Sequence, residues 1–280
     1  MKFAVIGHPV GHSLSPRMHT ANFRALGLDA TYGAVDVEPG AVPSALAQFR
    51  RGGFRGINVT VPHKLAARDC MTRLDATAVR AGAVNTVRFE EDGTMSGFNT
   101  DMAGFRQPLE ACGFPFPQAT VLLLGAGGAA QAVAAACLDA GCRALVWANR
   151  TPEKVEALAA RFKDARIATC SIAQLLAEKE TRLALQGTVP AAPVLIVNAT
   201  TVGLKPDDPS VLPAGFFHAD QFVYDLIPIA RETATLAAAR AAGAQTLGGL
   251  GMLAAQAAES FRIWTGLEPD LAAMRASLQG

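Results

Sequence analysis

Cysteine is scarce in this chain of 280 residues, and no two cysteines form a C-x-x-C pair. The cysteines are Cys70, Cys112, Cys137, Cys142 and Cys170. This spacing fits neither a disulfide framework nor a zinc site. We therefore predict buried, reduced thiols, no bound metal and a cytoplasmic protein.

Excess charge and long apolar runs are missing as well. The net charge is +1, so no basic field favours nucleic acid or an anionic membrane as a partner. No apolar run is long enough to span a bilayer, and the stretch 1–7 turns polar too early for a signal peptide. The chain has no repeats and no low-complexity tail. Its length and its 50% hydrophobic residues allow two modest domains, each with its own core.

The most informative stretch is an unbroken apolar run over 120–124, followed by a glycine turn and strong helix formers over 131–140. Such a run predicts a strand buried on both faces of a parallel sheet. Strand, turn and helix form the dinucleotide fingerprint G-x-G-x-x-G/A, with Ala130 in the last place. A glycine turn can also serve only to pack a helix on a strand, but the strand-to-helix context favours a pyrophosphate at the helix N-terminus. The predicted contacts are Gly125, Ala126, Gly127, Gly128 and Ala129.

The next predicted strand, 144–148, leads into Asn149-Arg150-Thr151. An NAD site commonly has an acidic residue here for the ribose 2′-hydroxyl. This stretch has none, and Arg150 with Lys154 can bind a 2′-phosphate through charge-assisted hydrogen bonds. The same residues also predict a helix start with Thr151 as N-cap, and both roles can hold at once. We predict NADP rather than NAD.

The first loop, 7–16, is dense in hydroxyl and imidazole groups. Pro16 suits the first turn of a helix, which makes Ser15 the natural N-cap. Capping is one possible role for Ser15. The other is that Ser13 and Ser15 together bind a carboxylate or a polyol.

A β-branched strand is predicted over 57–61, with Pro62 as the first residue of a helix. Thr60 and Lys64 then lie where ligands bind in open α/β sheets. An ordinary solvated lysine is the alternative for Lys64. His63 could be a general base, a cap or a packed ring, and the pattern does not decide between them.

Two further stretches, 82–87 and 97–104, carry amide, hydroxyl and carboxylate side chains where we expect strands to end. Thr100 or Asp101 can cap a helix, but capping does not explain the whole set. The cluster suits a small, hydroxylated, acidic substrate, and its members are Ser13, Ser15, Thr60, Lys64, Asn85 and Asp101. Gln256, among alanines of a predicted helix, indicates either a cleft or a half-exposed position.

These residues carry a resemblance to the shikimate dehydrogenases, which interconvert 3-dehydroshikimate and shikimate in aromatic amino-acid biosynthesis. The resemblance spans nearly the whole chain. Its motifs are Ser13-Leu14-Ser15-Pro16, Asn58 to Lys64, Gly82 to Thr86, Asn99-Thr100-Asp101, Gly125 to Ala130, Asn149-Arg150-Thr151, and Gln256 before Trp264-Thr265-Gly266.

The resemblance implies two α/β domains: a substrate domain over 1–103, completed by 236–280, and a Rossmann domain over 104–235. It implies Lys64 and Asp101 as the catalytic pair, and a structural role for His63. The implied substrate contacts are Ser13, Ser15, Thr60, Lys64, Asn85, Asp101 and Gln256. The implied NADP contacts are Gly125 to Ala129, Asn149, Arg150, Thr151, Lys154, Thr200, Leu226 and Gly249.

One stretch departs from the family pattern D-x-x-Y-x-P-x-x-T. In Asp225 to Thr233, Pro228 replaces the tyrosine and Ala230 replaces the proline. Because that tyrosine lies beside the substrate in relatives, substrate range and turnover are open. The alternatives are an NAD-using quinate/shikimate dehydrogenase, a paralogue acting on a related cyclic hydroxy acid, and a non-catalytic NADP-binding regulator. We expect a monomer or a homodimer.

Overall fold

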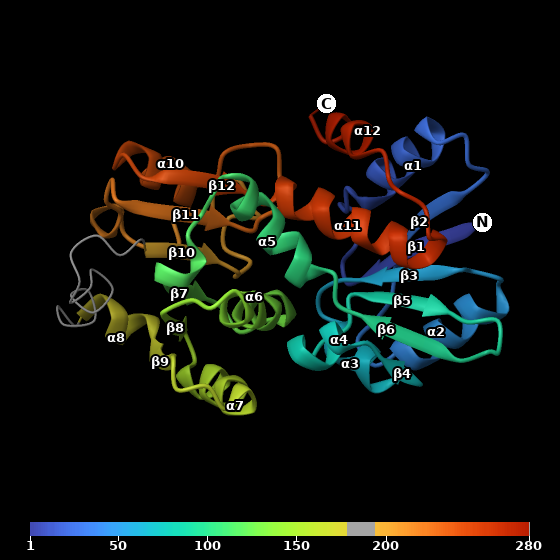
Figure 1. Ribbon diagram of the computed structural model, residues 1–280, viewed down its shortest axis with the longest axis horizontal. Helices are drawn as coiled ribbons and strands as arrows, with labels where there is room; N and C mark the ends of the chain where they lie inside the picture. The colour runs from blue at the N-terminus through green and yellow to red at the C-terminus, as the bar shows by residue number, and fades with distance from the viewer. Residues whose placement is uncertain (178–193, 280) are drawn as a thin grey trace. The chain divides into compact units, whose positions relative to one another are not determined.

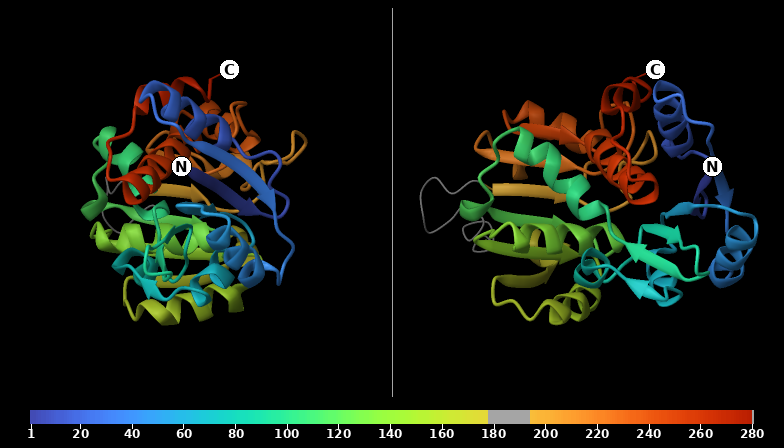
Figure 2. Two further views of the ribbon diagram at one scale, coloured as in Figure 1. Left: turned by 90° about the vertical axis from the view of Figure 1, so that its right-hand side faces the viewer. Right: turned by 45° about the vertical axis from the view of Figure 1, so that its right-hand side comes forward.

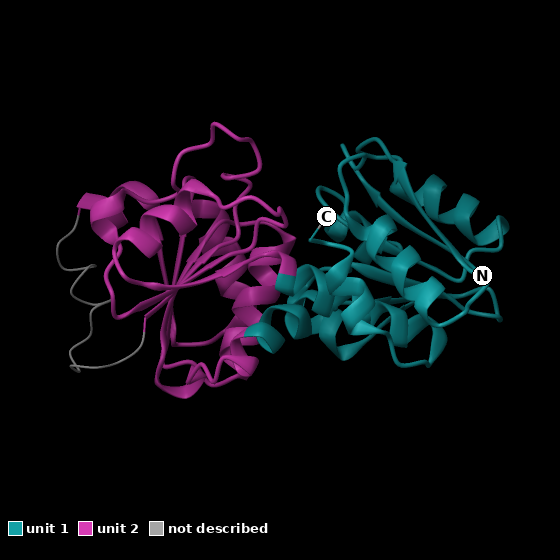
Figure 3. Cartoon of the chain, turned by 90° about the horizontal axis from the view of Figure 1, so that it is seen from above, with its two compact units in different colours: residues 1–108, 251–280 teal, residues 109–250 magenta. Residues whose placement is uncertain are grey.

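The computed structural model describes residues 1–177 and 194–279, and the chain divides into two compact units. Unit 1 comprises residues 1–108 and 251–280, and unit 2 comprises residues 109–250 (Figure 3). The chain therefore begins in unit 1, passes once through unit 2 and returns.

The expected domain boundaries, 103/104 and 235/236, both lie earlier in the chain than the boundaries of these units. Helix α5 (Asp101–Ala111) continues through the first expected boundary. Strand β12 (Gln245–Gly248) lies beyond the second and still pairs with β11 (Gln221–Asp225).

Unit 1 is built on a mixed six-stranded sheet. Its strands are β1 (Lys2–Gly7), β2 (Thr31–Asp36), β3 (Gly56–Val59), β4 (Arg73–Leu74), β5 (Thr86–Phe89) and β6 (Met95–Phe98). The spatial order is β2-β1-β3-β5-β6-β4, and β5 runs antiparallel to both β3 and β6 (Figure 1). Alternate residues of β1 face opposite sides, so Phe3 joins one core cluster and Ala4 the other.

Helices from both ends of the chain complete unit 1. They are α1 (Ser15–Ala25), α2 (Val42–Arg51), α3 (Lys64–Asp69), α4 (Ala76–Ala81), α11 (Leu250–Thr265) and α12 (Leu271–Ala276). Helix α11 adds Phe261 and Trp264 to the cluster that contains Phe3. Helix α12 lies beside α1, and the Asp270 N–H donates to Asn22 Oδ1 at 2.7 Å (Figure 2). The predicted return of the C-terminal helices to the first domain is confirmed.

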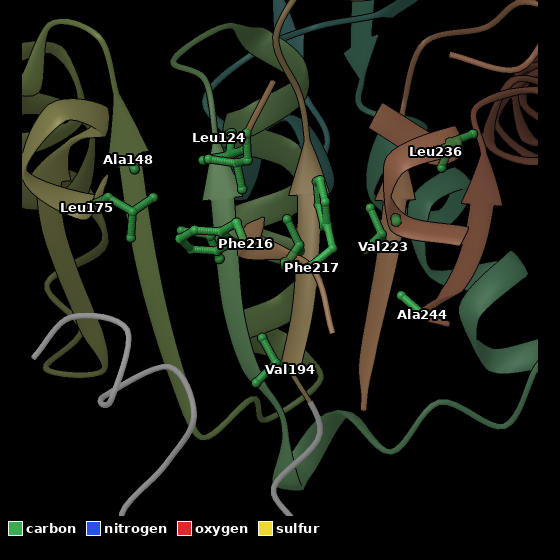
Figure 4. Packing of buried hydrophobic residues seen from close by; sticks show 13 residues of the cluster. Leu124, Ala148, Leu175, Val194, Phe216, Phe217, Val223, Leu236 and Ala244 are labelled. Carbon is green, nitrogen blue, oxygen red and sulfur yellow. The ribbon is translucent and has the colours of Figure 1, made fainter. Parts of the chain in front are cut away.

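Unit 2 contains a parallel six-stranded sheet in the order β12-β11-β10-β7-β8-β9. The further strands are β7 (Thr120–Leu124), β8 (Ala144–Asn149), β9 (Ile167–Ser171) and β10 (Val194–Asn198). Its helices are α6 (Gly128–Asp139), α7 (Pro152–Phe162), α8 (Ile172–Ala177) and α10 (Ala234–Ala241). Every residue of β7, β10 and β11 is buried, as the apolar run over 120–124 predicts for β7, and Figure 4 shows side chains of this core.

Several local predictions need correction. Ser15 is the first residue of α1 and not its cap; its N–H donates to Ser13 Oγ at 3.3 Å. Pro62 precedes the helix, because the His63 N–H donates to Thr60 O at 2.9 Å in a turn and α3 begins only at Lys64.

Other predictions differ in smaller ways. Helix α6 begins at Gly128, before the predicted start at 131. The cysteines form no disulfide, but only Cys137 and Cys142 are buried. Cys70 and Cys170 are half-buried, and Cys112, which follows the end of α5, is exposed. The stretch 178–192 is charged and then loop-like, which predicts extra surface structure, and it lies outside the described residues. Within the described parts of the chain, no helix is long and apolar enough to cross a membrane.

Candidate active site

Lys64 and Asp101 meet in unit 1. Each is the first residue of its helix, Lys64 of α3 and Asp101 of α5. Lys64 Nζ donates to Asp101 Oδ2, and the two side chains are only 12% and 7% exposed. Lys64 is therefore not a solvated lysine, and each buried charge has an opposite partner.

The second carboxylate oxygen of Asp101 is held by Asn85. Asn85 Nδ2 donates to Asp101 Oδ1 at 2.8 Å and to Thr100 Oγ1 at 2.9 Å. Asn85 Oδ1 accepts from the Thr100 N–H at 2.8 Å. Because the Asp101 N–H also donates to Asn99 Oδ1 at 3.1 Å, both the backbone and the carboxylate of Asp101 are fixed.

Gln256 lies on α11 and contacts Thr100, the residue before Asp101. Its side chain is buried, and its Oε1 accepts from the Thr100 hydroxyl at 3.4 Å. Gly104 of α5 allows the two helices to approach, since a Cβ there would lie 2.7 Å from Gln256 Cβ. Gln256 is therefore not half-exposed.

Ser13 lies in the loop after β1, Ser15 begins α1 at the end of that loop, and Thr60 directly follows β3, the neighbour of β1. The loop after β1 is joined to the end of β3 by the His8 N–H, which donates to Val61 O at 3.0 Å. His63 is buried, and its Nε2 lies 2.6 Å from Val37 O. The structure thus gives His63 a packing role.

In unit 2, the glycine turn joins β7 to α6 with the geometry that a dinucleotide needs. Gly125 has a φ of 112°, and a Cβ there would lie 2.8 Å from Ala199 O. Gly127 has open space around it, and α6 begins without a side-chain cap. The N–H groups at this helix start are free of side-chain competition, which fits a pyrophosphate.

The end of β8 presents two basic side chains to solvent. Asn149 Nδ2 donates to Thr151 O at 2.9 Å, which shapes the turn. Arg150, Thr151 and Lys154 are exposed. Thr151 does occupy the N-cap position of α7, but its side chain makes no capping hydrogen bond.

The remaining predicted cofactor residues lie after β10, β11 and β12. Thr200 Oγ1 donates to Asn198 Oδ1 at 2.7 Å, and the Leu226 N–H donates to Asn198 O at 3.0 Å. Gly249 lies so close to Leu226 that a Cβ would be 2.4 Å from its carbonyl oxygen. These residues thus meet at the carboxyl edge of the sheet.

The departure from the family pattern begins at the buried end of β11. Asp225 accepts from Thr233 Oγ1 at 2.6 Å and from Asn198 Nδ2 at 2.9 Å. Burial raises the pKa of the Asp225 carboxyl. These contacts hold both ends of the loop that contains Pro228.

A dinucleotide-type sheet in one unit and a buried lysine–aspartate pair in the other define a nicotinamide-dependent α/β oxidoreductase. Residues 5–87 match the family model described as shikimate dehydrogenase substrate binding domain, residues 111–202 that of shikimate/quinate 5-dehydrogenase, and residues 249–279 that of the shikimate 5′-dehydrogenase C-terminal domain. The chain belongs to the shikimate dehydrogenase family, and it is an NADP-dependent oxidoreductase.

Comparison with individual relatives points to the same family as the family models do. The NADP⁺ shikimate dehydrogenase of Moorella thermoacetica is 44% identical over 97% of this chain and 90% of its own length. The structure of the Aquifex aeolicus shikimate dehydrogenase matches with a TM-score of 0.88 and 36% identity, covering 100% of this chain and 98% of the other. That of the Thermus thermophilus enzyme, solved with NADP(H) and shikimate, matches with a TM-score of 0.83 and 41% identity over the same shares.

Sequence reasoning missed several polar residues beneath the site. Asn58 and Thr86 stand inside motifs that carry the resemblance, so a signal was present. Ser260 has no local signal, because only the packing of α11 brings it to Thr86, with 2.8 Å between the hydroxyl oxygens.

Proposed function

We propose that this chain catalyses the reversible reduction of 3-dehydroshikimate to shikimate, and that Lys64 and Asp101 are its catalytic residues. The observation that carries the proposal is the ion pair between these side chains, 12% and 7% exposed, among hydroxyl and amide groups. A lysine fixed in this way can both transfer a proton and polarise a carbonyl.

NADPH, when bound, supplies the hydride for C3 of the substrate. The C3 oxygen then takes a proton from the Lys64 ammonium, so that one N–H bond breaks and one O–H bond forms. Asp101 holds Lys64 Nζ in place during this transfer. In the reverse direction, neutral Lys64 removes the hydroxyl proton.

The proposed substrate contacts are hydroxyl, amide and carboxylate side chains, which match a small hydroxylated acid. They are Ser13, Ser15, Thr60, Asn85, Asp101 and Gln256. We assign the NADP phosphates to Gly125 to Ala129, Asn149, Arg150, Thr151 and Lys154, with further contacts from Thr200, Leu226 and Gly249. The enzyme acts as a monomer or a homodimer.

Pro228 supports a second candidate, a paralogue acting on a related cyclic hydroxy acid. The family tyrosine is a hydrogen-bonding group, and proline offers no side-chain donor. A substrate that needs no such donor would suit this loop.

Initial rates with shikimate and quinate, each with NADP⁺ and NAD⁺, test both candidates. We expect the shikimate–NADP⁺ pair to be the fastest. Faster turnover of quinate would favour the second candidate, and no turnover of shikimate with either cofactor would contradict the first.

A further inference from the structure

We propose that Thr86 is a positioning residue for this reaction, acting through a buried chain of hydrogen bonds from Tyr32 to Asp101. The inference rests on the proposed function, since it assigns Asp101 a catalytic role. The hydrogen-bond chain comprises Tyr32, Asn58, Thr86, Asn85 and Asp101. All five residues are buried.

The first part of the hydrogen-bond chain fixes the amide of Asn58. Tyr32 Oη donates to Asn58 Oδ1 at 2.6 Å. Asn58 Nδ2 donates to Asn85 O at 3.2 Å and to Thr86 Oγ1 at 3.1 Å. A backbone carbonyl can only accept, so the Asn58 atom facing Asn85 O must be the nitrogen. Asn58 therefore presents a donor to Thr86.

The second part connects Thr86 to Asn85. The Thr86 oxygen accepts from Asn58 Nδ2 at 3.1 Å, and the Thr86 hydroxyl donates its proton to Asn85 Oδ1 at 3.0 Å. Ser260 Oγ, 2.8 Å from Thr86 Oγ1, also accepts from Asn58 Nδ2, at 2.9 Å, and donates to Gln256 O at 3.0 Å.

The last part connects this proton to the catalytic pair. Asn85 Oδ1 accepts from Thr86 and from the Thr100 N–H, which leaves Asn85 Nδ2 facing Asp101 Oδ1 at 2.8 Å. A reversed amide would set oxygen against carboxylate. Since Thr86 is fully buried, no water replaces its hydroxyl if it is lost. The Thr86 hydroxyl thus helps hold Asp101, and through it Lys64, in the reactive geometry.

The test compares Thr86→Val, which keeps the shape and removes the hydroxyl, with Thr86→Ser, which keeps the hydroxyl. In the full-length enzyme, we expect Thr86→Val to lower kcat about tenfold, because a small misplacement of a catalytic group is costly. KM for NADP⁺ should change less than about twofold, since the cofactor contacts are untouched. The solvent deuterium isotope effect on kcat should rise, and Thr86→Ser should stay within about threefold of the wild-type kcat.

Thr120→Val is the matched control, because Thr120 is also buried and also begins a strand, but lies in unit 2. We expect its kcat to remain near the wild-type value. If Thr86→Val does not fold, Tyr32→Phe removes the first donor of the hydrogen-bond chain and should lower kcat in the same direction. Equal kcat values for Thr86→Val and Thr86→Ser, or an equal fall in Thr120→Val, would overturn the inference.

A second readout separates this inference from the proposed function. Reductive ¹³C-methylation labels Lys64, and Lys64→Arg identifies its NMR signal. We expect this signal to move toward those of exposed lysines in Thr86→Val but not in Thr86→Ser. If the wild-type enzyme did not turn over shikimate, the proposed function would fail, and an unmoved Lys64 signal would separately overturn the role of Thr86.

Discussion

At the residue scale, the position of Lys64 is unfavourable without its partner. A cation in the first turn of a helix opposes the helix dipole, whereas an anion there is favoured. Asp101 also begins a helix, so its negative charge is stabilised by the dipole of α5. The same charge offsets the unfavourable interaction of Lys64 with the dipole of α3. The two residues act as one unit, and removal of either leaves a buried charge unpaired.

Replacing Lys64 with alanine should lower kcat by roughly 10²–10⁴-fold, the usual contribution of an acid–base group. Shikimate binding should change far less, because the other polar contacts remain. Steady-state kinetics and calorimetric titration measure the two effects. Lys205→Ala, an exposed lysine in unit 2, is the control. Near-normal kcat in Lys64→Ala would remove this lysine from the chemistry.

His19 predicts a pH dependence of stability. Its ring is fully buried, stacks on Tyr32 at 4.3 Å, and has no hydrogen-bond partner at either nitrogen among the described residues. Burial lowers the pKa of His19 from 6.5 to about 3. Between these values the unfolded chain binds a proton that the folded chain does not, so stability is lost as the pH falls through this window.

The variant His19→Phe keeps a stacked ring and removes this titration. Urea denaturation at several pH values across this window measures the unfolding free energy of both proteins. The unfolding free energy of His19→Phe minus that of the wild type should increase as the pH falls, by up to about 1.4 kcal/mol per pH unit. A constant difference between the two proteins at every pH would contradict the assignment.

At the element scale, β7 was predictable because a strand buried on both faces is an unbroken apolar run. Strand β12 was not, since Gln245–Gly248 carries no such run and forms only by pairing with β11. The prediction that Pro62 begins a helix was wrong, because proline suits a turn as well as a first helical position.

Ser13, Thr60 and Asp101 could be found because they follow strands. Asn85 was expected where a strand ends but instead precedes β5, and it reaches the site because β5 runs antiparallel to β3. The link of the motif residues to Ser260 could not be found, because it depends on long-range packing.

The turn after β8 makes the choice of cofactor testable. Arg150→Ala should raise KM for NADP⁺ roughly ten- to a hundredfold, because a hydrogen bond to a charged group contributes about 1.5–3 kcal/mol. KM for NAD⁺ should barely change, since NAD⁺ lacks the 2′-phosphate. Arg240→Ala, at an exposed arginine of α10, serves as the control. Equal losses with both cofactors would make Arg150 merely structural.

The loop after β11 carries the departure from the family. Its ends are fixed by the Thr233–Asp225 hydrogen bond, so a side chain at 228 can be changed within a held loop. Pro228→Tyr adds a phenol, and we expect KM for shikimate to fall several-fold, since one neutral hydrogen bond contributes about 0.5–1.5 kcal/mol. KM for quinate should not move. No gain for shikimate, together with faster wild-type turnover of another cyclic hydroxy acid, would favour the paralogue.

At the scale of the whole molecule, each unit contains one of the two tryptophans, and both are buried. Trp147 lies in unit 2, where its Nε1 donates to Gly125 O at 2.7 Å, and Trp264 lies in unit 1, where its Nε1 donates to Val87 O at 2.9 Å. Fluorescence therefore reports each unit separately once the other tryptophan is replaced by phenylalanine.

With these probes, NADP⁺ should stabilise unit 2 more than unit 1. At about 100 times its dissociation constant, a ligand that binds only the folded form adds about 2.7 kcal/mol. We expect this shift in urea denaturation of Trp264→Phe, which retains Trp147, and a smaller shift in Trp147→Phe. Equal shifts would mean that the two units unfold as one.

The interrupted sequence of unit 1 also sets an order for folding during translation. Domains generally fold as units as the chain leaves the ribosome. Here residues 109–250 emerge as one uninterrupted stretch, whereas the cluster around Phe3 waits for Phe261 and Trp264 near the end of the chain. The unit that binds the nucleotide can therefore be complete before the unit with the lysine–aspartate pair, although it comes second in the gene.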